Sequence, residues 1–477
     1  MNERIPLQLV DGDEGTLYAR QPKVYPREIK GRFQRLRNAA VLWLLGMFYV
    51  FPWLNWDGRQ MVLFDLPHRK FYILGLTFWP QDFFFMAWLL IMAGLSLFFF
   101  TALAGRLWCG YACPQTVWTE AFLWIERKIE GDRNQRMRLD KAPWGAKKFA
   151  RKGLKQLAWI AFALWTGFTF VGFFTPIREL AGEVAHFDLG GWEMFWIAFY
   201  GFATYGNAGF LREQVCKYMC PYARFQGAMF DRDTLIISYD EPRGEDRGHR
   251  KRGTPSVLDW ADKDGERPAL GDCIDCQACV QVCPTGIDIR NGLQVGCIAC
   301  AACIDACDAI MDKMAYPRGL IRYTTEHAME GKPSRVLRVR TLIYATVLLL
   351  LAGAFAWSIG HRSMLLAEVL RDRNALWRAG PAGSVENSYT LKLVNKSDQP
   401  MTLTLSLDGD TPLVLVGRQR LDIAGGEVAS VPVTLRAPAG SVHGRQRVTL
   451  QLNSTDPNAS QPVADVTTAF FAPSDSP

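Results

Sequence analysis

The sequence predicts a multi-domain integral membrane protein. An α-helical membrane bundle of about five spans carries an inserted cysteine-rich domain and a C-terminal immunoglobulin-like β-sandwich. Three observations predict this class. The apolar residues, 49% of the 477-residue chain, gather in runs too long for soluble helices. All twelve cysteines fall into four short clusters. Near the C-terminus, apolar and polar side chains alternate as they do in strands with one buried face.

Five apolar runs are long enough to cross a bilayer, which takes about 20 residues. The opening thirty-seven residues are polar and lack the apolar core and cleavage site of a secretory signal, so we expect the first run to be a retained anchor. The third and fourth runs are interrupted by Gly and Thr. The five predicted spans lie near Asn38 to Asn55, Asp82 to Ala104, Gln156 to Phe174, Trp192 to Phe210 and Arg340 to Ile359.

Basic residues beside the spans predict the orientation, because Lys and Arg favour the cytoplasmic side. The segment from Ala104 to Gly153 carries eleven basic and five acidic residues, whereas Thr175 to Gly191 carries one basic and three acidic residues. The first segment is therefore expected in the cytoplasm, with the cysteine-rich insert, and everything after about Ile359 outside. The net charge of +7 reflects these inner loops. No nucleic-acid partner is expected, because no basic platform interleaved with aromatic residues appears.

Four cysteines form an internal repeat, Cys109-Gly-Tyr-Ala-Cys113-Pro114 and Cys216-Lys-Tyr-Met-Cys220-Pro221, with 107 residues between equivalent positions. Each motif follows the second helix of an expected hairpin, so the membrane region is predicted to be a duplicated two-helix unit. Proline is favoured at the first helical position, which predicts new helices over 114–129 and 221–230. Aromatic and charged residues mixed along the first of these suit a helix lying on the inner membrane surface.

The other eight cysteines have the spacing of a bacterial ferredoxin that holds two cubane clusters. Three thiolates of one loop reach three irons of a cube, and the fourth ligand comes from the other run. Zinc is the rival ligand, but one zinc ion takes four thiolates and would leave four of the eight unexplained. The predicted ligands are Cys273, Cys276, Cys279 and Cys307 for one 4Fe-4S cluster, and Cys297, Cys300, Cys303 and Cys283 for the other.

The four thiols of the repeated motif allow three interpretations. Soft thiolates select Cu(I), zinc or iron–sulfur clusters, so Cys109, Cys113, Cys216 and Cys220 are a candidate metal site. A dithiol–disulfide redox pair is the second interpretation. Buried free cysteines that pack as small hydrophobic residues are the third. The sharing of one six-residue pattern by two segments favours the two functional interpretations.

The remaining segments complete the predicted domain order. A stretch rich in Gly, Pro and charge reads as a connector, Ser363 to Trp377 reads as helical, and alternating runs separated by turn signals read as a sandwich. The expected parts are an N-terminal tail (1–37), a four-helix membrane region with both C-x3-C-P motifs (38–238), a polar linker (239–270), a two-cluster ferredoxin-type domain (271–325), a fifth span (339–360) and a β domain (380–477).

Together these features resemble the CcoG/FixG/RdxA family of cytochrome c oxidase accessory proteins over nearly the whole chain. The resemblance implies a multi-pass protein of the bacterial inner membrane, with a cytoplasmic ferredoxin domain and a periplasmic β domain. It implies a role in assembly of the cbb3-type oxidase, in which the clusters reduce Cu(II) to Cu(I) before copper delivery. Cys109, Cys113, Cys216 and Cys220 then become candidate copper contacts. Oxidase subunits or copper chaperones become the expected partners, with a cytoplasmic electron donor that leaves no motif.

Two other functions stay open at this point. The C-x3-C-P hairpins and the eight-cysteine run also look similar to NapH-type membrane ferredoxins, which would make the chain a quinol- or ferredoxin-linked electron carrier. The β domain from about Ser384 to Ala472 discriminates, because such carriers lack it. Alternatively, the sandwich docks to oxidase subunits and the clusters are structural.

Overall fold

The computed structural model describes residues 23–260, 268–373, 375–397, 399–408, 412–454 and 462–473. The chain divides into two compact units. The first unit comprises residues 1–68 and 85–352, and holds the membrane bundle and the cysteine-rich domain. The second comprises residues 69–84 and 353–477, and holds the β domain.

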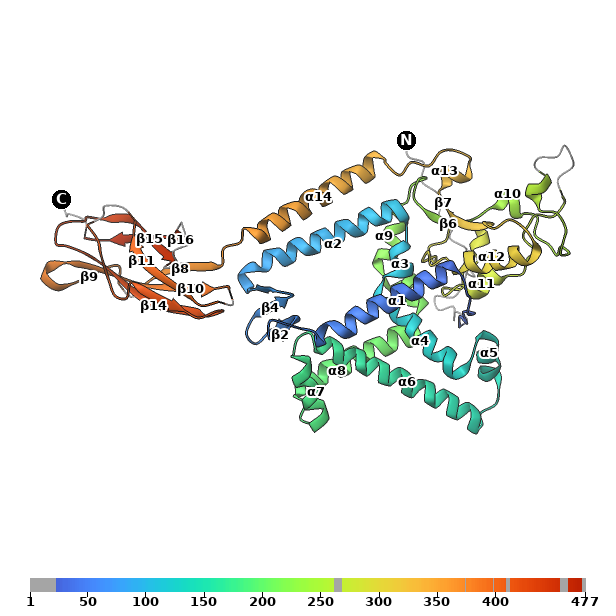
Figure 1. The fold of residues 1–477 in the computed structure, drawn as a ribbon, viewed down its shortest axis with the longest axis horizontal. Helices are drawn as coiled ribbons and strands as arrows, with labels where there is room; N and C mark the ends of the chain where they lie inside the picture. The colour runs from blue at the N-terminus through green and yellow to red at the C-terminus, as the bar shows by residue number, and fades with distance from the viewer. Residues whose placement is uncertain are drawn as a thin grey trace, which may run out of the picture. The chain divides into compact units, whose positions relative to one another are not determined.

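Four helices in the described residues are long and apolar enough to cross a membrane. They are α1 (Arg32–Val50), α2 (Phe83–Ala104), α6 (Ala146–Val171) and α14 (Val339–Gly360), and they lie on the first, second, third and fifth predicted spans (Figure 1).

The fourth predicted span is less regular than expected, so a bundle of five spans is not established. Helix α8 (Gly191–Thr204) has only 14 residues and continues as a π-helical segment, η3 (Tyr205–Leu211). Gly206 and Gly209 fall in that segment, where weak helix propensity favours an altered hydrogen-bond pattern. Helix α8 packs on α6, and Gly167 makes the contact possible, because a Cβ there would lie 2.3 Å from the Ile197 carbonyl oxygen.

Both C-x3-C-P motifs lie at the start of a helix, with the proline in its first turn. The first motif spans α3 (Leu107–Tyr111) and the beginning of α4 (Pro114–Glu130). The second spans a π-helical turn, η4 (Val215–Met219), and the beginning of α9 (Pro221–Met229). Helices α5 (Arg133–Lys141) and α7 (Ile177–His186), a 3-10 turn (Phe51–Trp53) and short strands β1 (Asn55–Trp56), β2 (Arg59–Gln60) and β3 (Val62–Asp65) complete the bundle.

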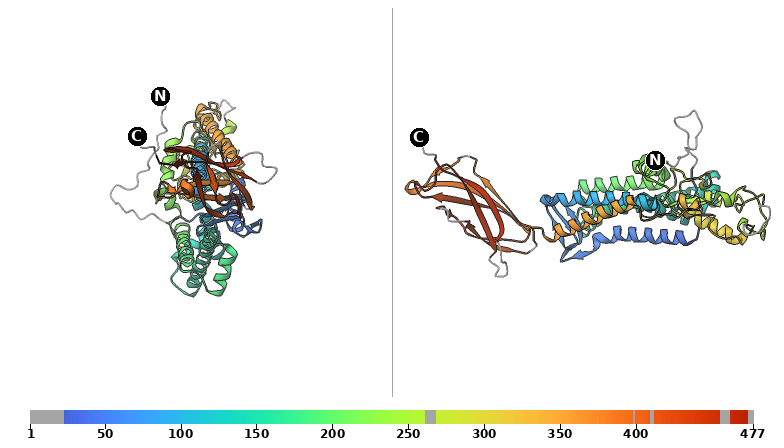
Figure 2. Two further views of the ribbon diagram at one scale, coloured as in Figure 1. Left: turned by 90° about the vertical axis from the view of Figure 1, so that its left-hand side faces the viewer. Right: turned by 90° about the horizontal axis from the view of Figure 1, so that it is seen from above.

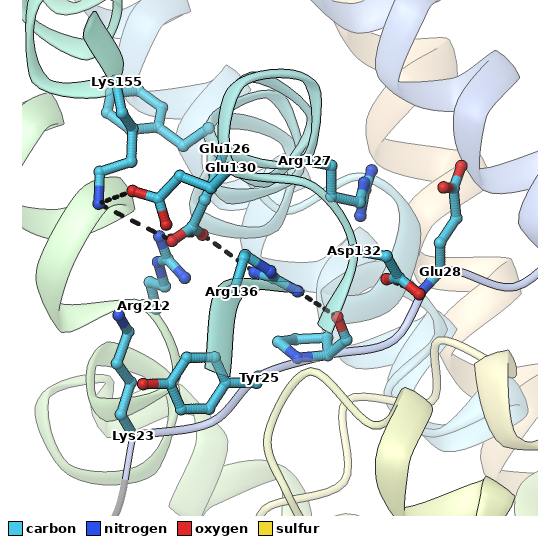
Figure 3. Close-up of polar contacts among 12 residues, drawn as sticks. Lys23, Tyr25, Glu28, Glu126, Arg127, Glu130, Asp132, Arg136, Lys155 and Arg212 are labelled. Atoms are coloured by element: carbon cyan, nitrogen blue, oxygen red, sulfur yellow. Dashed lines mark hydrogen bonds and ion pairs between the residues drawn. The ribbon is translucent and has the colours of Figure 1, made fainter. Parts of the chain in front are cut away.

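Helix α4 differs from the expected surface helix, because its carboxylates are buried in ion pairs. Glu126 is 1% exposed, and its Oε2 lies 3.1 Å from Arg136 Nη1 and 2.9 Å from Arg212 Nη2 (Figure 3). Glu130 is fully buried, with Oε1 3.0 Å from Lys155 Nζ. These cations come from other segments, so the helix sequence alone gave no sign of its partners.

The cysteine-rich domain is closed by a two-stranded antiparallel sheet that joins segments far apart in sequence. Strand β6 (Ile236–Tyr239) pairs with β7 (Ile321–Thr324). The domain's main helices are α11 (Ala278–Val282) and α12 (Ala302–Met314), and both pack in its apolar core. Shorter turns are α10 (Glu241–Gly244), η5 (Val257–Trp260), η6 (Ile289–Asn291) and α13 (Glu326–Met329).

The polar segment before the first cysteine run is more than a solvated connector. Asp272 is fully buried and accepts from Arg243 Nε at 2.8 Å, Arg250 Nη1 at 3.1 Å and Ser256 Oγ at 2.6 Å. Arg243 is 6% exposed. The charges of this segment therefore fasten it to the cysteine-rich domain, while residues 261–267 lie outside the described part.

The second unit is a sandwich of two antiparallel sheets around one apolar core (Figure 2). One sheet has the order β12-β14-β10-β8, with β9 beside β10, and the other has the order β13-β11-β15-β16. The strands are β8 (Leu365–Arg371), β9 (Arg378–Ala379), β10 (Val385–Asn395), β11 (Met401–Leu407), β12 (Val414–Val416), β13 (Arg420–Ile423), β14 (Val428–Ala437), β15 (Arg445–Ser454) and β16 (Pro462–Phe471).

The helix expected over 363–377 is wrong, because β8 occupies this segment and pairs with β10. By its pattern alone, the short apolar run there fits a helix or a strand. The pairing with β10 favours the strand. The unit also includes β4 (Lys70–Ile73), β5 (Leu76–Phe78) and the turn η2 (Pro80–Asp82). Lys396 Nζ pairs with Asp82 Oδ1 at 2.7 Å, and both side chains are buried.

Candidate iron–sulfur and thiol site

Two small cavities in the cysteine-rich domain are lined by four predicted ligands each. One is lined by Cys273, Cys276, Cys279 and Cys307. The other is lined by Cys283, Cys297, Cys300 and Cys303, and Cys279 also reaches its wall. Each cavity therefore combines three cysteines of one run with the last cysteine of the other. Four convergent thiols around a cavity fit a 4Fe-4S cube in number and chemistry.

The backbone explains how each run wraps around its cavity. Left-handed residues flank the middle cysteine of both runs: Asp275 (φ 51°) and Gln277 (φ 53°) in the first, Ala299 (φ 52°) and Ala301 (φ 61°) in the second. This conformation costs an L-residue about 1–2 kcal/mol. Successive turns of this kind direct backbone N–H groups to the inside of a loop, where they favour a negatively charged group. Both cysteine runs therefore carry strained residues at equivalent positions.

Cys276 is exposed, but burial of other thiols in the two runs affects their protonation before a cluster forms. Burial raises the pKa of Cys279 and of Cys297 to about 12. The thiolate is the ligand, so cluster formation must release protons from these groups. Among the residues that the structure describes, no three His, Cys, Asp or Glu side chains converge as the ligands of one metal ion.

The structure brings the two C-x3-C-P motifs together. Burial, and after it the nearby thiols Cys113, Cys109 and Cys220, together raise the pKa of Cys216 to about 12. Burial likewise raises the pKa of Cys109 to about 11, and Cys113 and Cys220 contribute. The Cys109 thiol also lies 3.4 Å from Gln226 Oε1, to which it donates. Thiols 107 residues apart in sequence therefore form one group.

This thiol group lies directly against the second cysteine run. Cys109 and Cys216 pack on the apolar cluster that contains Ile298 and Cys300. The contact is close because residue 110 is glycine: a Cβ there would lie 2.7 Å from the Ile298 carbonyl oxygen and 2.9 Å from Cys300 Cα. Backbone therefore touches backbone between the motif and the predicted cluster loop.

Arg106 joins the three segments at this contact. Its guanidinium donates to the carbonyls of Cys297, at 3.2 Å, and of Val295 in the second run, and to the carbonyl of Ala223 on α9. The side chain is 6% exposed. From sequence, Arg106 counted only as one of the basic residues that set orientation. Its position three residues before Cys109 was the sole signal of another role.

A second bridge comes from tyrosines. Tyr323 on β7 donates its hydroxyl to the Ala299 carbonyl at 2.6 Å, and Tyr111 of the first motif hydrogen-bonds to Tyr323. Tyr111 was expected only to pack. The loop of the second run is thus held from both the membrane bundle and the domain's own sheet.

Models of known families match most of the chain. A 4Fe-4S dicluster domain matches residues 211–326, and a 4Fe-4S binding domain matches residues 84–131. The Ig-like fold at the C-terminus of FixG matches residues 355–473. The predicted iron–sulfur domain and Ig-like domain are confirmed by these matches.

Individual proteins match over greater lengths. The nitrogen fixation protein FixG of Rhizobium meliloti (strain 1021) is 40% identical over 433 residues, which cover 83% of this chain and 81% of FixG. Protein RdxA of Cereibacter sphaeroides is 39% identical over 481 residues, which cover 95% and 98% of the two chains. The crystal structure of a FixG-related protein from Vibrio parahaemolyticus is 32% identical over 23% of this chain and 97% of that chain, with a TM-score of 0.20.

The full-length similarity, the dicluster domain and the FixG-type C-terminal domain lead to one assignment. The chain belongs to the FixG/RdxA family.

Proposed function

We propose that the protein reduces Cu(II) to Cu(I) and hands the copper on during assembly of a cbb3-type cytochrome c oxidase. Two 4Fe-4S clusters would be held by Cys273, Cys276, Cys279 and Cys307, and by Cys283, Cys297, Cys300 and Cys303. Copper is the substrate, and Cys109, Cys113, Cys216 and Cys220 are its candidate contacts. When bound, each cluster supplies one electron at a time, which is what Cu(II) needs.

The observation that carries the proposal is the direct contact between the thiol group and the second cysteine run. Cys109 and Cys216 pack against the apolar cluster that contains Cys300, and Gly110 lets the two backbones touch. A copper ion on these thiols would therefore lie directly against the loop of the second cysteine run. Thiolates also prefer Cu(I) to Cu(II), so the ligand set favours the reduced product.

The proposal includes a location and partners. The protein would span the bacterial inner membrane, with the ferredoxin-type domain in the cytoplasm and the Ig-like domain in the periplasm. The excess of basic residues between Ala104 and Gly153 supports this orientation. Oxidase subunits or copper chaperones would take the Cu(I).

Two other functions compete with copper reduction. A NapH-like electron carrier is disfavoured by the FixG-type domain over residues 355–473. A docking factor with structural clusters is favoured by one observation, that the sandwich has an apolar core of its own. Copper reduction and docking differ in whether the clusters transfer electrons.

Anaerobic EPR tests copper reduction. The purified protein is reduced with dithionite, desalted and titrated with Cu(II), while the reduced-cluster and Cu(II) signals are both followed. We expect the two signals to disappear together, one Cu(II) per reduced cluster. Cys109→Ser and Cys216→Ser should slow the reaction at least tenfold, whereas Tyr218→Phe, an exposed change inside the second motif, should not. Cu(II) that persists beside reduced clusters would overturn the proposal.

A further inference from the structure

A large cavity of the first unit lies between helices α1, α4 and α6 and the two cysteine runs. Its volume is about 980 Å³, far more than a structural void needs. Apolar side chains form most of its wall, among them Leu45, Leu123, Phe162 and Trp165. The copper proposal makes no use of this space.

One end of the cavity is polar and charged. Arg37 and Glu120 form an ion pair there, and they are 5% and 6% exposed. Arg127 Nη2 also lies 3.0 Å from Glu120 Oε1, and all three residues line the cavity. The cavity therefore suits an amphipathic molecule with a polar head at this end and an apolar body along the helices.

The polar end adjoins the predicted second cluster. Pro284 and Ala302 line the cavity, and they are the neighbours in sequence of Cys283 and Cys303. Arg37 and Pro284 also line a second, smaller cavity together with Cys216. A molecule in the cavity would therefore lie within one residue of two predicted ligands, Cys283 and Cys303, where electron exchange is favoured over simple storage.

The apolar end opens on surface that a membrane would cover. Leu42 on α1 is 73% exposed and Trp165 on α6 is 50% exposed; both line the cavity, and both helices are candidate membrane spans. An occupant would enter from the bilayer, which selects a lipid-soluble molecule over a nucleotide or a soluble protein.

We propose that this cavity binds a lipid-soluble quinol, with its ring at the Arg37–Glu120 end, and that the quinol is the electron donor of the protein. The quinol would be the source of the electrons that reduce Cu(II). This inference rests on the proposed function only for Cu(II) as the final electron acceptor.

The electron count of this reaction is consistent with two clusters. Oxidation of one quinol to its quinone breaks two O–H bonds and releases two electrons and two protons. Two one-electron clusters accept the electrons, and the protons pass to water at the rim of the cavity, where the exposed residues Glu28, Lys30 and Arg35 line it. Arg37 and Arg106, both buried beside the second run, favour the more negative reduced state there and bring the acceptor closer to a quinol in potential.

A photoreactive azido-quinone tests binding without any redox readout. In nanodiscs, cross-linked peptides should map to residues 26–45 and 120–127. Leu45→Trp fills the cavity and should lower the cross-link yield at least tenfold. Leu44→Trp adds the same side chain one position away, where residue 44 does not line the cavity, and should leave the yield unchanged. Ala121→Phe narrows the cavity from α4 and replaces Leu45→Trp if that variant does not fold.

The same three proteins are then mixed with decylubiquinol and with menadiol under anaerobic EPR. We expect either quinol to reduce the clusters of the wild type and of Leu44→Trp. The same quinol should reduce the clusters of Leu45→Trp at least tenfold more slowly. Dithionite should reduce the clusters of all three proteins equally. The inference would be overturned by cross-links outside the two segments. It would also be overturned if dithionite, but neither quinol, reduced the clusters. Either result would leave a phospholipid as the occupant. Quinol-reduced clusters that fail to reduce Cu(II) would overturn the proposed function alone.

Discussion

Residue 110 shows how a single glycine controls the contact between the thiol group and the second cysteine run. Its neighbours across the contact are backbone atoms, which cannot rotate away as a flexible side chain can. Any side chain at this position must therefore separate the first motif from the loop that carries Cys300. Separation lengthens the path between the two thiol sets without removing a single ligand.

Gly110→Ala should therefore separate redox function from cluster content. We expect a loss of about 1–3 kcal/mol in the free energy of unfolding, as for other overpacked contacts, and slower Cu(II) reduction with an undiminished dithionite-reduced EPR signal. Gly153→Ala is the matched control, since a Cβ there meets nothing within 4 Å. Its helix should be stabilised by up to about 1 kcal/mol. Equal Cu(II) reduction rates in the two variants would show that the contact is irrelevant to transfer.

Individual cysteines could be predicted from sequence, but the arginines beside them could not. The spacing of the eight cysteines already implied that the last cysteine of each run shares a site with the first three cysteines of the other run. Arg37 and Arg106 gave no comparable signal, because basic residues near the ends of spans are explained by orientation alone. Their partners, Glu120 and the carbonyls of the second run, lie 83 or more residues away.

At the scale of elements, helix α4 depends on charges that other helices supply. Burial alone would raise the pKa of Glu126, but Arg212, Arg136 and Lys155 outweigh it and hold that pKa below its usual range. The folded protein therefore keeps Glu126 ionised, and the ion pairs contribute to stability wherever the carboxylate is charged.

Replacement of this carboxylate should destabilise the bundle. Glu126→Gln leaves Arg136 and Arg212 buried without a counter-charge, which typically costs about 3–5 kcal/mol. Because the pKa of Glu126 is lower in the folded state, its contribution is complete above the ordinary carboxyl pKa of about 4.3 and is lost as the pH falls below that value. Thermal unfolding followed from pH 7 down to about pH 3 should therefore show a smaller loss of stability for Glu126→Gln than for the wild type.

Glu179→Gln is the control for that measurement. Glu179 is exposed on α7, so its replacement should change the free energy of unfolding by less than about 0.5 kcal/mol and leave the acid loss intact. Equal stability of the two variants at pH 7 would mean that the buried ion pairs on α4 are replaceable by neutral hydrogen bonds.

Elements were predictable from sequence where one long pattern decided the structure. Apolar runs of about 20 residues located α1, α2, α6 and α14, because little but a membrane-crossing helix buries so many. The prediction was less accurate where neighbours decide. Residues 191–211 divide between an α-helix and a π-helical segment, and the apolar run of β8 becomes a strand only through β10.

At the scale of the whole molecule, the two units separate the redox chemistry from the Ig-like domain. All twelve cysteines lie in the first unit. The second unit has an apolar core of its own and is linked along the chain through residues 69–84 as well as through α14.

Deletion of residues after His361 tests this separation. We expect unchanged cluster EPR signals and Cu(II) reduction, and a loss of assembled cbb3-type oxidase of at least about tenfold, as measured by haem staining of membranes. The deletion also removes Lys396 and leaves Asp82, which is 4% exposed in the full chain, without its cation. Asp82→Asn in the full-length protein controls for that loss. Normal oxidase levels in the truncated strain would exclude docking by the Ig-like domain.

The bridge made by Arg106 has a consequence for biogenesis. Its acceptor, the carbonyl of Val295, is synthesised 189 residues later. The helices that surround the thiol group can therefore enter the membrane before the second cysteine run has left the ribosome. The second cysteine run would then dock onto a bundle that is already in place, and the proposed second cluster would be inserted into a domain already attached to the membrane.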